Sequence, residues 1–285
     1  MLTPILAVIP APPTDPSGRL PWAIEVGPLS VRPYGVLIAI GVLIAMTVAR
    51  RRYVARGGDG ELADKVAFRA VVMGFVGARL AYVLPRLEYF LANPLQIPQV
   101  WEGGLALFGG LTLGTLTVVV LFRRWGGDLP AFLDAAAPGV PIAQALGRWG
   151  NYFNQELYGT PSSLPWGLFV DPSFRVDRYT AFSTFHPTFL YESLWNLGLA
   201  TFLLWLDRRG RLPKGALALV YFIGYALARF ALELLRTDTT YRLLGLSRNA
   251  WVSLFIALGA AAGLRVWTSR KPAPPLERAP ETSEV

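Results

Sequence analysis

Apolar residues along the chain gather into long runs that are separated by short polar segments. A helix of about 20 apolar residues crosses a hydrocarbon core about 30 Å thick. Seven runs approach this length, at residues 33–49, 66–84, 105–122, 131–150, 187–206, 215–235 and 249–267. The pattern therefore predicts an all-α polytopic membrane protein with seven transmembrane helices.

The segments outside these runs divide the chain into three parts. Residues 1–32 form a proline-rich outer arm, residues 33–268 the transmembrane domain, and residues 269–285 a polar tail whose composition indicates disorder. The longest internal loop, residues 151–185, is rich in aromatic and turn residues. We interpret it either as a small ordered head at the membrane surface or as an interfacial aromatic belt.

Basic residues set the expected orientation, because short loops rich in Lys and Arg remain in the cytoplasm. Alternate polar segments, at residues 50–65, 123–128, 207–214 and 265–285, contain fifteen of the 27 basic residues, and the opposite segments contain eight. With seven spans, this bias places the N-terminus outside, the C-terminus in the cytoplasm and the head loop in the periplasm.

Composition agrees with a membrane protein and excludes several chemistries. Charged residues make up 16% of the 285 positions, against roughly 25% in a typical soluble domain. The cytoplasmic loops and their attraction to anionic lipids account for the net charge of +8, so no nucleic-acid partner is expected. The chain has no cysteine and one histidine, His186, which excludes a disulfide, a cysteine nucleophile and a histidine-rich metal site. No cofactor is indicated.

Arg148 lies where the fourth run ends, in the segment GRWGNYFNQELYG. A charged side chain within a span costs at least about 2.5–3.5 kcal/mol on insertion scales, so it normally faces a cavity and a partner. In a continuing helix, Arg148, Asn151 and Gln155 share one face, and the amides favour a binding site. The alternative is an arginine that extends to the outer interface and is neutralised by Asp134 or Glu156.

The sixth run ends in YALARFALELLRTD, where four polar residues form one stripe on an apolar segment: Tyr225, Arg229, Glu233 and Arg236. Glu233 has the spacing to pair with both arginines. The stripe is either a self-contained ion-pair ladder that packs two helices or a cation site for an anion near the outer leaflet. Arginine suits the second interpretation, because its planar fork binds two phosphate oxygens at once.

The segment WEGGLALFGGLTLG contains two glycine pairs, Gly103 with Gly104 and Gly109 with Gly110. Glycines at these positions permit close backbone approach or a tight re-entry into the membrane. Glycine is also common in packed membrane helices, so the pairs alone do not indicate a function.

The fifth run begins with HPTFLYESLW, in which His186 precedes Pro187. Proline is common at the first position of a helix, so the pair indicates a helix start. Tyr191 and Glu192 then lie one turn into the span. A lone histidine at such a junction is more often a cap or an interface anchor than a catalytic group.

Together these motifs resemble the signature segments of the bacterial prolipoprotein diacylglyceryl transferase family. GRWGNYFNQELYG is the most specific of them, and VRPYGVLIAIGV, GARLAYVL, WEGGLALFGGL, HPTFLYE and GYALARFALELLRTD follow the family's order between about residues 25 and 268. The resemblance implies seven transmembrane helices with a small periplasmic head. It also implies an enzyme of the bacterial plasma membrane that moves the diacylglyceryl group of phosphatidylglycerol to the lipobox cysteine of a prelipoprotein and releases glycerol-1-phosphate.

The resemblance further implies a set of site residues. The positions that match the family's essential residues are Tyr34, Arg148, Asn151, Glu156, Gly159, Tyr225, Arg229, Glu233 and Arg236, and Asp134 and Arg79 match polar positions within its helices. Many members have a histidine before the second Gly-Gly pair, which has been proposed as the base for the thiol proton. Here the position is Phe108, which accepts no proton.

The expected reaction is attack of the substrate's thiolate on the glyceryl carbon while a phosphate monoester departs. Arg148 and Arg229 are expected to stabilise the charge that develops on this phosphate, and Asn151 and Tyr34 to bind phosphate or glycerol hydroxyls. The expected catalytic residues are Arg148, Arg229, Glu156 and Tyr34. The expected lipid-binding residues are Arg148, Asn151, Gly159, Tyr225, Arg229, Glu233 and Arg236. The expected supporting residues are Asp134, Arg79, His186, Gly103, Gly104, Gly109 and Gly110. A lipid or anion transporter and an assembly scaffold with buried ion pairs are the competing interpretations.

Overall fold

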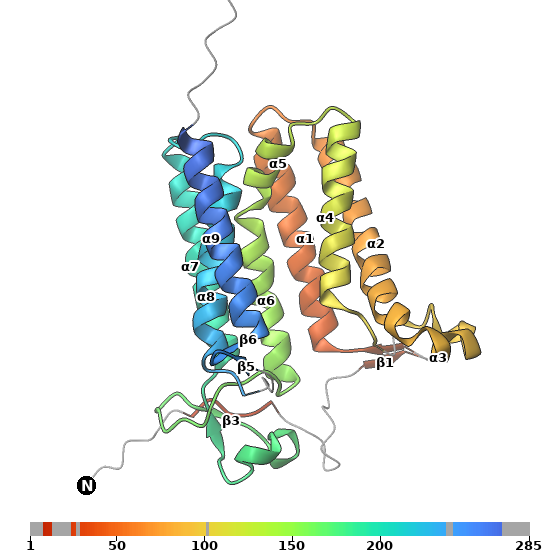
Figure 1. Cartoon of the computed structure of the whole chain (residues 1–285), viewed down its shortest axis with the longest axis vertical. Helices are drawn as coiled ribbons and strands as arrows, with labels where there is room; N and C mark the ends of the chain where they lie inside the picture. Colours follow the sequence, from red (N-terminus) through yellow and green to blue (C-terminus); the bar gives the residue numbers. More distant parts are fainter. Residues whose placement is uncertain (1–7, 13–23, 27–28, 101–102, 238–241, 270–285) are drawn as a thin grey trace, which may run out of the picture.

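The computed structural model describes residues 8–12, 24–26, 29–100, 103–237 and 242–269 (Figure 1). The predicted disordered tail lies outside the described residues except for Ser269, and so does most of the predicted outer arm. The longer helices are α1 (Pro33–Val54), α2 (Gly60–Val83), α4 (Leu107–Arg124), α6 (Gly139–Phe153), α7 (Thr188–Arg208), α8 (Ala216–Glu233) and α9 (Arg248–Ser269). The shorter ones are α3 (Leu87–Ala92) and α5 (Leu129–Ala136).

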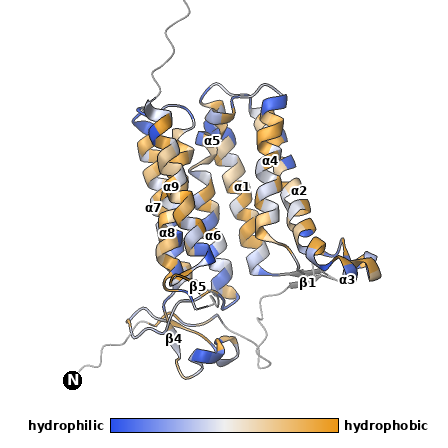
Figure 2. Ribbon diagram, viewed as in Figure 1, coloured by the Kyte–Doolittle hydropathy of each residue, from blue (hydrophilic) through white to orange (hydrophobic). Residues whose placement is uncertain are grey.

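The chain is mostly helical, as the apolar runs predict. Among the described residues, six helical segments are long and apolar enough to cross a membrane: Pro33–Val54, Gly60–Ala92, Leu107–Arg124, Thr188–Arg208, Ala216–Glu233 and Arg248–Ser269. Hydrophobic and neutral residues predominate along these helices, and many of the hydrophilic residues lie toward their ends (Figure 2). This distribution is that of a polytopic membrane protein.

The predicted fourth span, residues 131–150, is not one continuous helix. Its residues divide between α5 and α6, with a break at Ala137 and Pro138, and α6 has only 15 residues. Ala137 and Pro138 both keep right-handed helical backbone angles, so the interruption is a local break in hydrogen bonding. It fits a proline, which provides no backbone N–H and whose ring crowds the carbonyl four residues earlier. The two pieces follow one another along α1, which packs against both (Figure 1).

Two of the predicted glycines join α2 to α4. A Cβ atom on Gly109 would collide with the carbonyl group of Gly77, and one on Gly110 would lie 3.0 Å from the carbonyl oxygen of Gly74. The backbones of the two helices are therefore in direct contact, which is the usual role of small residues between membrane helices. Gly109 and Gly110 serve packing and not re-entry.

Residues 154–187 fold into a compact unit at the end of α6 and α7 (Figure 1). Strand β3 (Leu168–Phe169) pairs antiparallel with β4 (Thr184–Phe185). The side chains of Leu168 and Phe185 pack with those of Tyr158 and Val170 in a buried apolar cluster. The hydroxyl of Tyr158 donates to the carbonyl of Phe174 (2.8 Å), and burial raises the pKa of this hydroxyl. The loop is thus an ordered head with its own apolar core.

The N-terminal segment belongs to this head. Ile9 forms a parallel bridge with Leu168, donating to the carbonyl of Gly167 and accepting from Phe169, both at 2.9 Å. The hydroxyl of Tyr152 on α6 donates to the carbonyl of Pro10 at 2.9 Å. A segment far away in the sequence therefore extends the small sheet of the head and attaches it to α6.

Candidate active site

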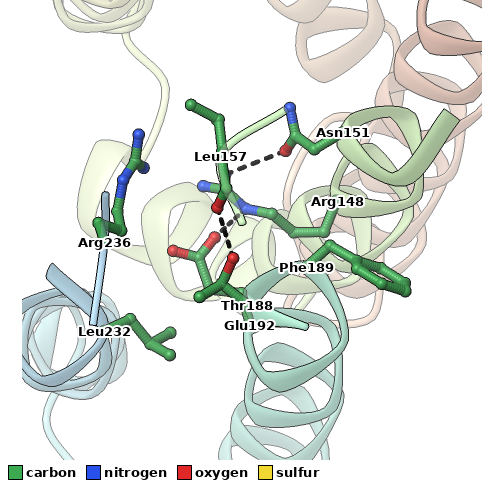
Figure 3. A pocket seen from close by; sticks show the side chains of 8 residues that line it. All are labelled: Arg148, Asn151, Leu157, Thr188, Phe189, Glu192, Leu232 and Arg236. Carbon is green, nitrogen blue, oxygen red and sulfur yellow. Dashed lines mark hydrogen bonds and ion pairs between the residues drawn. The ribbon is translucent and has the colours of Figure 1, made fainter. Parts of the chain in front are cut away.

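Two arginines from different helices meet at one carboxylate. Arg148 of α6 contacts Oε2 of Glu192 through its Nε, and Nη1 of Arg229 in α8 lies 3.2 Å from Oε1 of the same side chain. Glu192 comes from the second turn of α7 and is buried, with 8% of its side chain exposed. Three helices are thus joined through one glutamate, and Figure 3 shows its contact with Arg148.

Arg148 also connects to a chain of amides. Its Nη1 donates to Oδ1 of Asn151 (3.2 Å), and Nδ2 of Asn151 donates to Oε1 of Glu156 (2.9 Å), which also accepts from Asn154 (3.0 Å). Glu156 therefore acts on Arg148 through Asn151 and not by a direct ion pair. The alternative that Asp134 or Glu156 neutralises Arg148 is wrong, because the carboxylate in contact is Glu192.

Gln155 does not share the face of Arg148 and Asn151, contrary to the prediction. Helix α6 ends at Phe153, and Gln155 takes a left-handed conformation with φ of 49°. Its side chain turns into the head instead, where Nε2 donates to Asp171 (2.7 Å) and Oε1 accepts from the backbone of Asp171 (2.9 Å).

Glu233 pairs with both arginines of the predicted stripe. Its Oε2 lies 2.8 Å from Nη2 of Arg229 and 3.9 Å from Nε of Arg236, and its Oε1 accepts from Ser247 (2.9 Å). The predicted helical stripe stops early, because α8 ends at Glu233. Arg236 lies beyond the helix and forms a backbone bridge with Gly159.

Gly159 allows the head to approach the helices closely. A Cβ atom here would lie 2.7 Å from Cβ of His186 and 3.2 Å from the carbonyl oxygen of Leu235. Its N–H donates to the carbonyl of His186 (2.9 Å), while the next residue, Thr160, donates to Leu235 (2.8 Å). The glycine therefore holds the strand-like segment after α8 against the head.

A cavity of about 720 Å³ opens beside the arginines and runs between the helices. Its walls are mainly apolar, and its polar lining comprises Tyr34, Gln144, Arg148, Asn151, Tyr225, Arg229 and Arg236. This volume is within the ~300–1,000 Å³ range of ligand pockets. The site is thus a long apolar space that ends at a cluster of guanidinium groups.

Asp134 lies away from this cluster. Its carboxylate accepts from the backbone N–H groups of Gly215 (2.6 Å) and Ala218 (3.0 Å), at the N-terminus of α8. Free N–H groups at a helix N-terminus attract a carboxylate, so Asp134 fixes the start of α8 relative to α5. The arginines lie at the other end of α8.

Arg79 lies on α2 and contacts the backbone of the loop before α4. Its guanidinium donates to the carbonyls of Gln96 (2.6 Å), Ile97 (2.7 Å), Gly103 (2.7 Å) and Gly104 (3.0 Å). Gly103 and Gly104 have φ of 95° and 75°, which favours glycine, and they turn their carbonyls toward Arg79. The four bonds hold the connection between α3 and α4 against α2.

His186 precedes the N-cap of α7, which is Pro187. Nδ1 of His186 lies 3.3 Å from the hydroxyl of Tyr191, which also accepts from Nε1 of Trp166 (3.0 Å). His186 does not line the cavity of the arginines. Phe108, at the family's histidine position, has an exposed side chain, and its neighbour Leu107 lines the cavity instead.

Glu192 is the site residue that the sequence interpretation did not assign. The signal was present, because Glu192 is a carboxylate within an apolar run, and the cost that drew attention to the arginines applies equally to a carboxylate. Among the described residues, no three carboxylate or imidazole groups gather in a way that suits a metal ion.

These features define a class: a polytopic helical membrane protein with a cluster of arginines and glutamates beside a mainly apolar cavity. The sequence profile of the prolipoprotein diacylglyceryl transferase family matches residues 21–266. The chain belongs to this family.

Individual relatives agree with the family match. Phosphatidylglycerol–prolipoprotein diacylglyceryl transferase 2 of Streptomyces coelicolor is 43% identical over 94% of this chain and 83% of its own length. The transferase of Frankia alni is 42% identical over 95% of this chain and 70% of its own length. That of Corynebacterium diphtheriae is 38% identical over 91% of this chain and 95% of its own length.

Proposed function

We propose that this protein transfers the diacylglyceryl group of phosphatidylglycerol to the lipobox cysteine thiol of a prelipoprotein. The products are a thioether-linked lipid on the cysteine and free glycerol-1-phosphate, and the reaction is the first step of lipoprotein maturation. Membership of the transferase family supports the reaction, and relatives named for it align with more than nine-tenths of the chain.

The observation that carries the proposal is the pair Arg148 and Arg229 at the end of the apolar cavity. Both guanidinium groups line the cavity, whose walls are mainly apolar along α1, α2, α4 and α6. A phospholipid has the matching division, with an anionic phosphate between a polar glycerol and two hydrocarbon chains. The arginines bind the phosphate with charge-assisted hydrogen bonds, and the apolar walls accommodate the acyl chains.

The reaction joins sulfur to carbon and separates carbon from oxygen. The thiolate of the substrate attacks the glyceryl carbon next to the phosphate, and the bonding electrons of the C–O bond remain on the phosphate oxygen. Arg148 and Arg229 stabilise the charge that grows there, where one well-placed donor is worth about 3–4 kcal/mol. The positive field lowers the pKa of the thiol and favours the thiolate, whose proton passes to water, so that the phosphate monoester departs with two negative charges.

The remaining predicted residues fall into roles around this phosphate. Asn151 and Tyr34 line the cavity next to Arg148 and provide hydrogen bonds to phosphate or glycerol oxygens. Glu156 orients Asn151, and Glu233 orients Arg229. Tyr225 and Arg236 complete the polar wall of the cavity, and Gly159 keeps the segment before Arg236 in place.

The chain lies in the bacterial plasma membrane as seven spans, with α5 and α6 together forming the fourth. The loops with most of the basic residues connect the ends opposite to the head (Figure 1). The positive-inside bias then places these loops in the cytoplasm and the head and arginine cluster toward the outer leaflet. Phosphatidylglycerol in that leaflet and a translocated prelipoprotein both reach a site in this position.

One assay tests the proposal against its alternatives. The purified protein is incubated with phosphatidylglycerol labelled in the headgroup glycerol and with a lipobox peptide. The expected result is a thioether-lipidated peptide together with an equal amount of labelled glycerol-1-phosphate. A transporter moves the lipid or anion across a vesicle membrane without forming either product. A scaffold neither moves the lipid nor forms a product. If folded protein forms neither product, the proposal is overturned.

A further inference from the structure

Glu192 occupies the place between the two phosphate-binding arginines. One carboxylate oxygen contacts Arg148 and the other lies 3.2 Å from Arg229, and the same glutamate lines a small cavity that Asn151 and Arg236 also line. A carboxylate and a phosphate bind guanidinium in the same planar, two-oxygen geometry. Glu192 therefore uses donors that a bound phosphate needs.

The other carboxylates of the cluster lie differently. Glu233 pairs with Nη2 of Arg229 and accepts hydrogen bonds from Ser247 and Asn249, and Glu156 accepts from two asparagines. Among the contacts of the described residues, Glu192 is the carboxylate that joins Arg148 to Arg229. It is thus the negative charge placed to repel an anion that approaches both arginines.

The repulsion is not equal for substrate and product. The phosphodiester of phosphatidylglycerol carries one negative charge, whereas a phosphate monoester carries about 1.5 to 2 at neutral pH because its second pKa is near 6. Coulomb repulsion from a fixed carboxylate grows with that charge and is strong in a buried, low-dielectric site. A carboxylate at this point therefore weakens binding of the product more than binding of the substrate.

We propose that Glu192 is a positioning residue that competes with phosphate for Arg148 and Arg229 and thereby promotes release of the monoester product. The inference rests on the proposed function. When phosphate occupies the site, the guanidinium groups exchange part of their contact with Glu192 for the lipid. When the monoester has formed, Glu192 regains both arginines and expels it. The carboxylate also keeps the two like charges at a fixed separation while the site is empty of lipid.

The test is the substitution Glu192→Gln, which keeps the size of the side chain and one carbonyl oxygen but removes the charge. We expect glycerol-1-phosphate to inhibit the variant about tenfold or more strongly than the wild type, with KM for phosphatidylglycerol and kcat both lowered. Glu192→Asp restores the charge, so its inhibition constant returns toward the wild-type value. A side chain that only braces three helices also lowers kcat on substitution, but it leaves inhibition by the product unchanged or weaker, so product inhibition separates the two roles.

Two controls make the test specific. Glu156→Gln removes a carboxylate that contacts asparagines and not arginines, and it leaves inhibition by glycerol-1-phosphate no stronger than in the wild type. The second control needs no variant and holds even where Glu192→Gln fails to fold. In the wild type, dianionic glycerol-1-phosphate binds no more tightly than its monoanionic methyl ester, since Glu192 offsets the gain from the extra charge.

Tenfold tighter binding of the dianion to the wild type, or unchanged product inhibition in folded Glu192→Gln, overturns the inference. Either result leaves the transfer reaction intact. Failure of the wild type to form the thioether, by contrast, removes the proposed function itself, so the two failures are distinguishable.

Discussion

Arg148 and Arg229 each divide their guanidinium donors between the protein and the cavity. Arg148 donates to Asn151 and pairs with Glu192, and Arg229 pairs with Glu192 and Glu233. Both residues also line the apolar cavity. A buried charge without a partner costs several kcal/mol, so these contacts are what allow the arginines to lie among apolar helices. The same contacts fix the direction in which the remaining donors point.

Removing either arginine therefore abolishes most of the activity. We expect Arg148→Ala and Arg229→Ala each to lower kcat by about 10²–10³, the usual cost of one lost donor at developing charge. Arg148→Lys keeps the charge without the planar fork, so we expect its kcat to lie between those of the wild type and Arg148→Ala. Transfer of labelled diacylglycerol to a lipobox peptide measures the effect, and thermal unfolding in detergent verifies that each variant is folded.

Arg69 provides the matched control for this experiment. It is another arginine within an apolar helix, but it donates to the carbonyl of Lys65 and lies over the ring of Trp125, outside the cavity lining. Arg69→Ala keeps turnover within a few-fold of the wild type. Near-normal turnover in Arg148→Ala or Arg229→Ala would remove that arginine from the mechanism.

Phe108 tests where the thiol proton goes. Its side chain is 60% exposed on the first turn of α4 and does not line the arginine cavity. A histidine in its place lies outside the cavity lining, so Phe108→His leaves turnover at neutral pH within a few-fold. A rise by orders of magnitude, measured with the same labelled lipid across pH 6 to about 9, would mean that a base at this position is the missing proton acceptor.

Contacts between site residues could be predicted from the sequence where both residues lie on one regular helix. Arg229 and Glu233 are four residues apart on α8 and meet as expected. The prediction that Gln155 shares the face of Arg148 is wrong, because no sequence signal here marks the positive φ with which Gln155 leaves the helix. Glu192 could not be paired with its arginines from sequence alone, since the three residues lie on three helices.

At the scale of elements, the contact between α2 and α4 depends on Gly109. The position has no room for a methyl group, because Gly77 and Ala81 occupy the space where a Cβ atom would lie. We expect Gly109→Ala to lower the free energy of unfolding by about 1–3 kcal/mol, the usual cost of overpacking. Unfolding of the purified protein in detergent with increasing denaturant measures the change.

Gly259 in α9 is the matched control, since no atom lies within 4 Å of a Cβ placed there. Gly259→Ala leaves stability unchanged or raises it by up to about 1 kcal/mol, because alanine loses less backbone entropy than glycine on folding. Equal stability of the two variants would show that the close approach of α2 and α4 does not contribute to the fold.

The interrupted fourth run shows where prediction of elements fails. Hydrophobicity alone marks residues 131–150 as one span, and it carries no information on whether the backbone continues. Pro138 was the available signal, because a proline in an apolar run ends or kinks a helix. The other six runs contain no break of this kind and form helices close to the predicted bounds.

At the scale of the whole molecule, the two ends of the helical bundle differ in kind. One end carries the head, the N-terminal strand segment and the arginine cluster, and the other carries short loops rich in basic residues (Figure 1). Sequence predicted this asymmetry from charge, but it could not predict that Ile9 pairs with Leu168, since the pairing joins segments that are far apart in the chain. The proposed orientation of the molecule in the membrane rests on the same asymmetry.

The absence of cysteine allows this orientation to be tested with single introduced thiols. Ser173 is exposed on the head, and Pro213 is exposed in the loop between α7 and α8 at the opposite end. Neither substitution changes a charge, so the positive-inside bias is preserved. We expect a membrane-impermeant maleimide to label Ser173→Cys in intact spheroplasts, and to label Pro213→Cys only after the membrane is permeabilised. Labelling of both residues in intact cells would indicate leakage or a mixed topology, and the reverse pattern would place the arginine cluster on the cytoplasmic side, where a translocated prelipoprotein has no access to it.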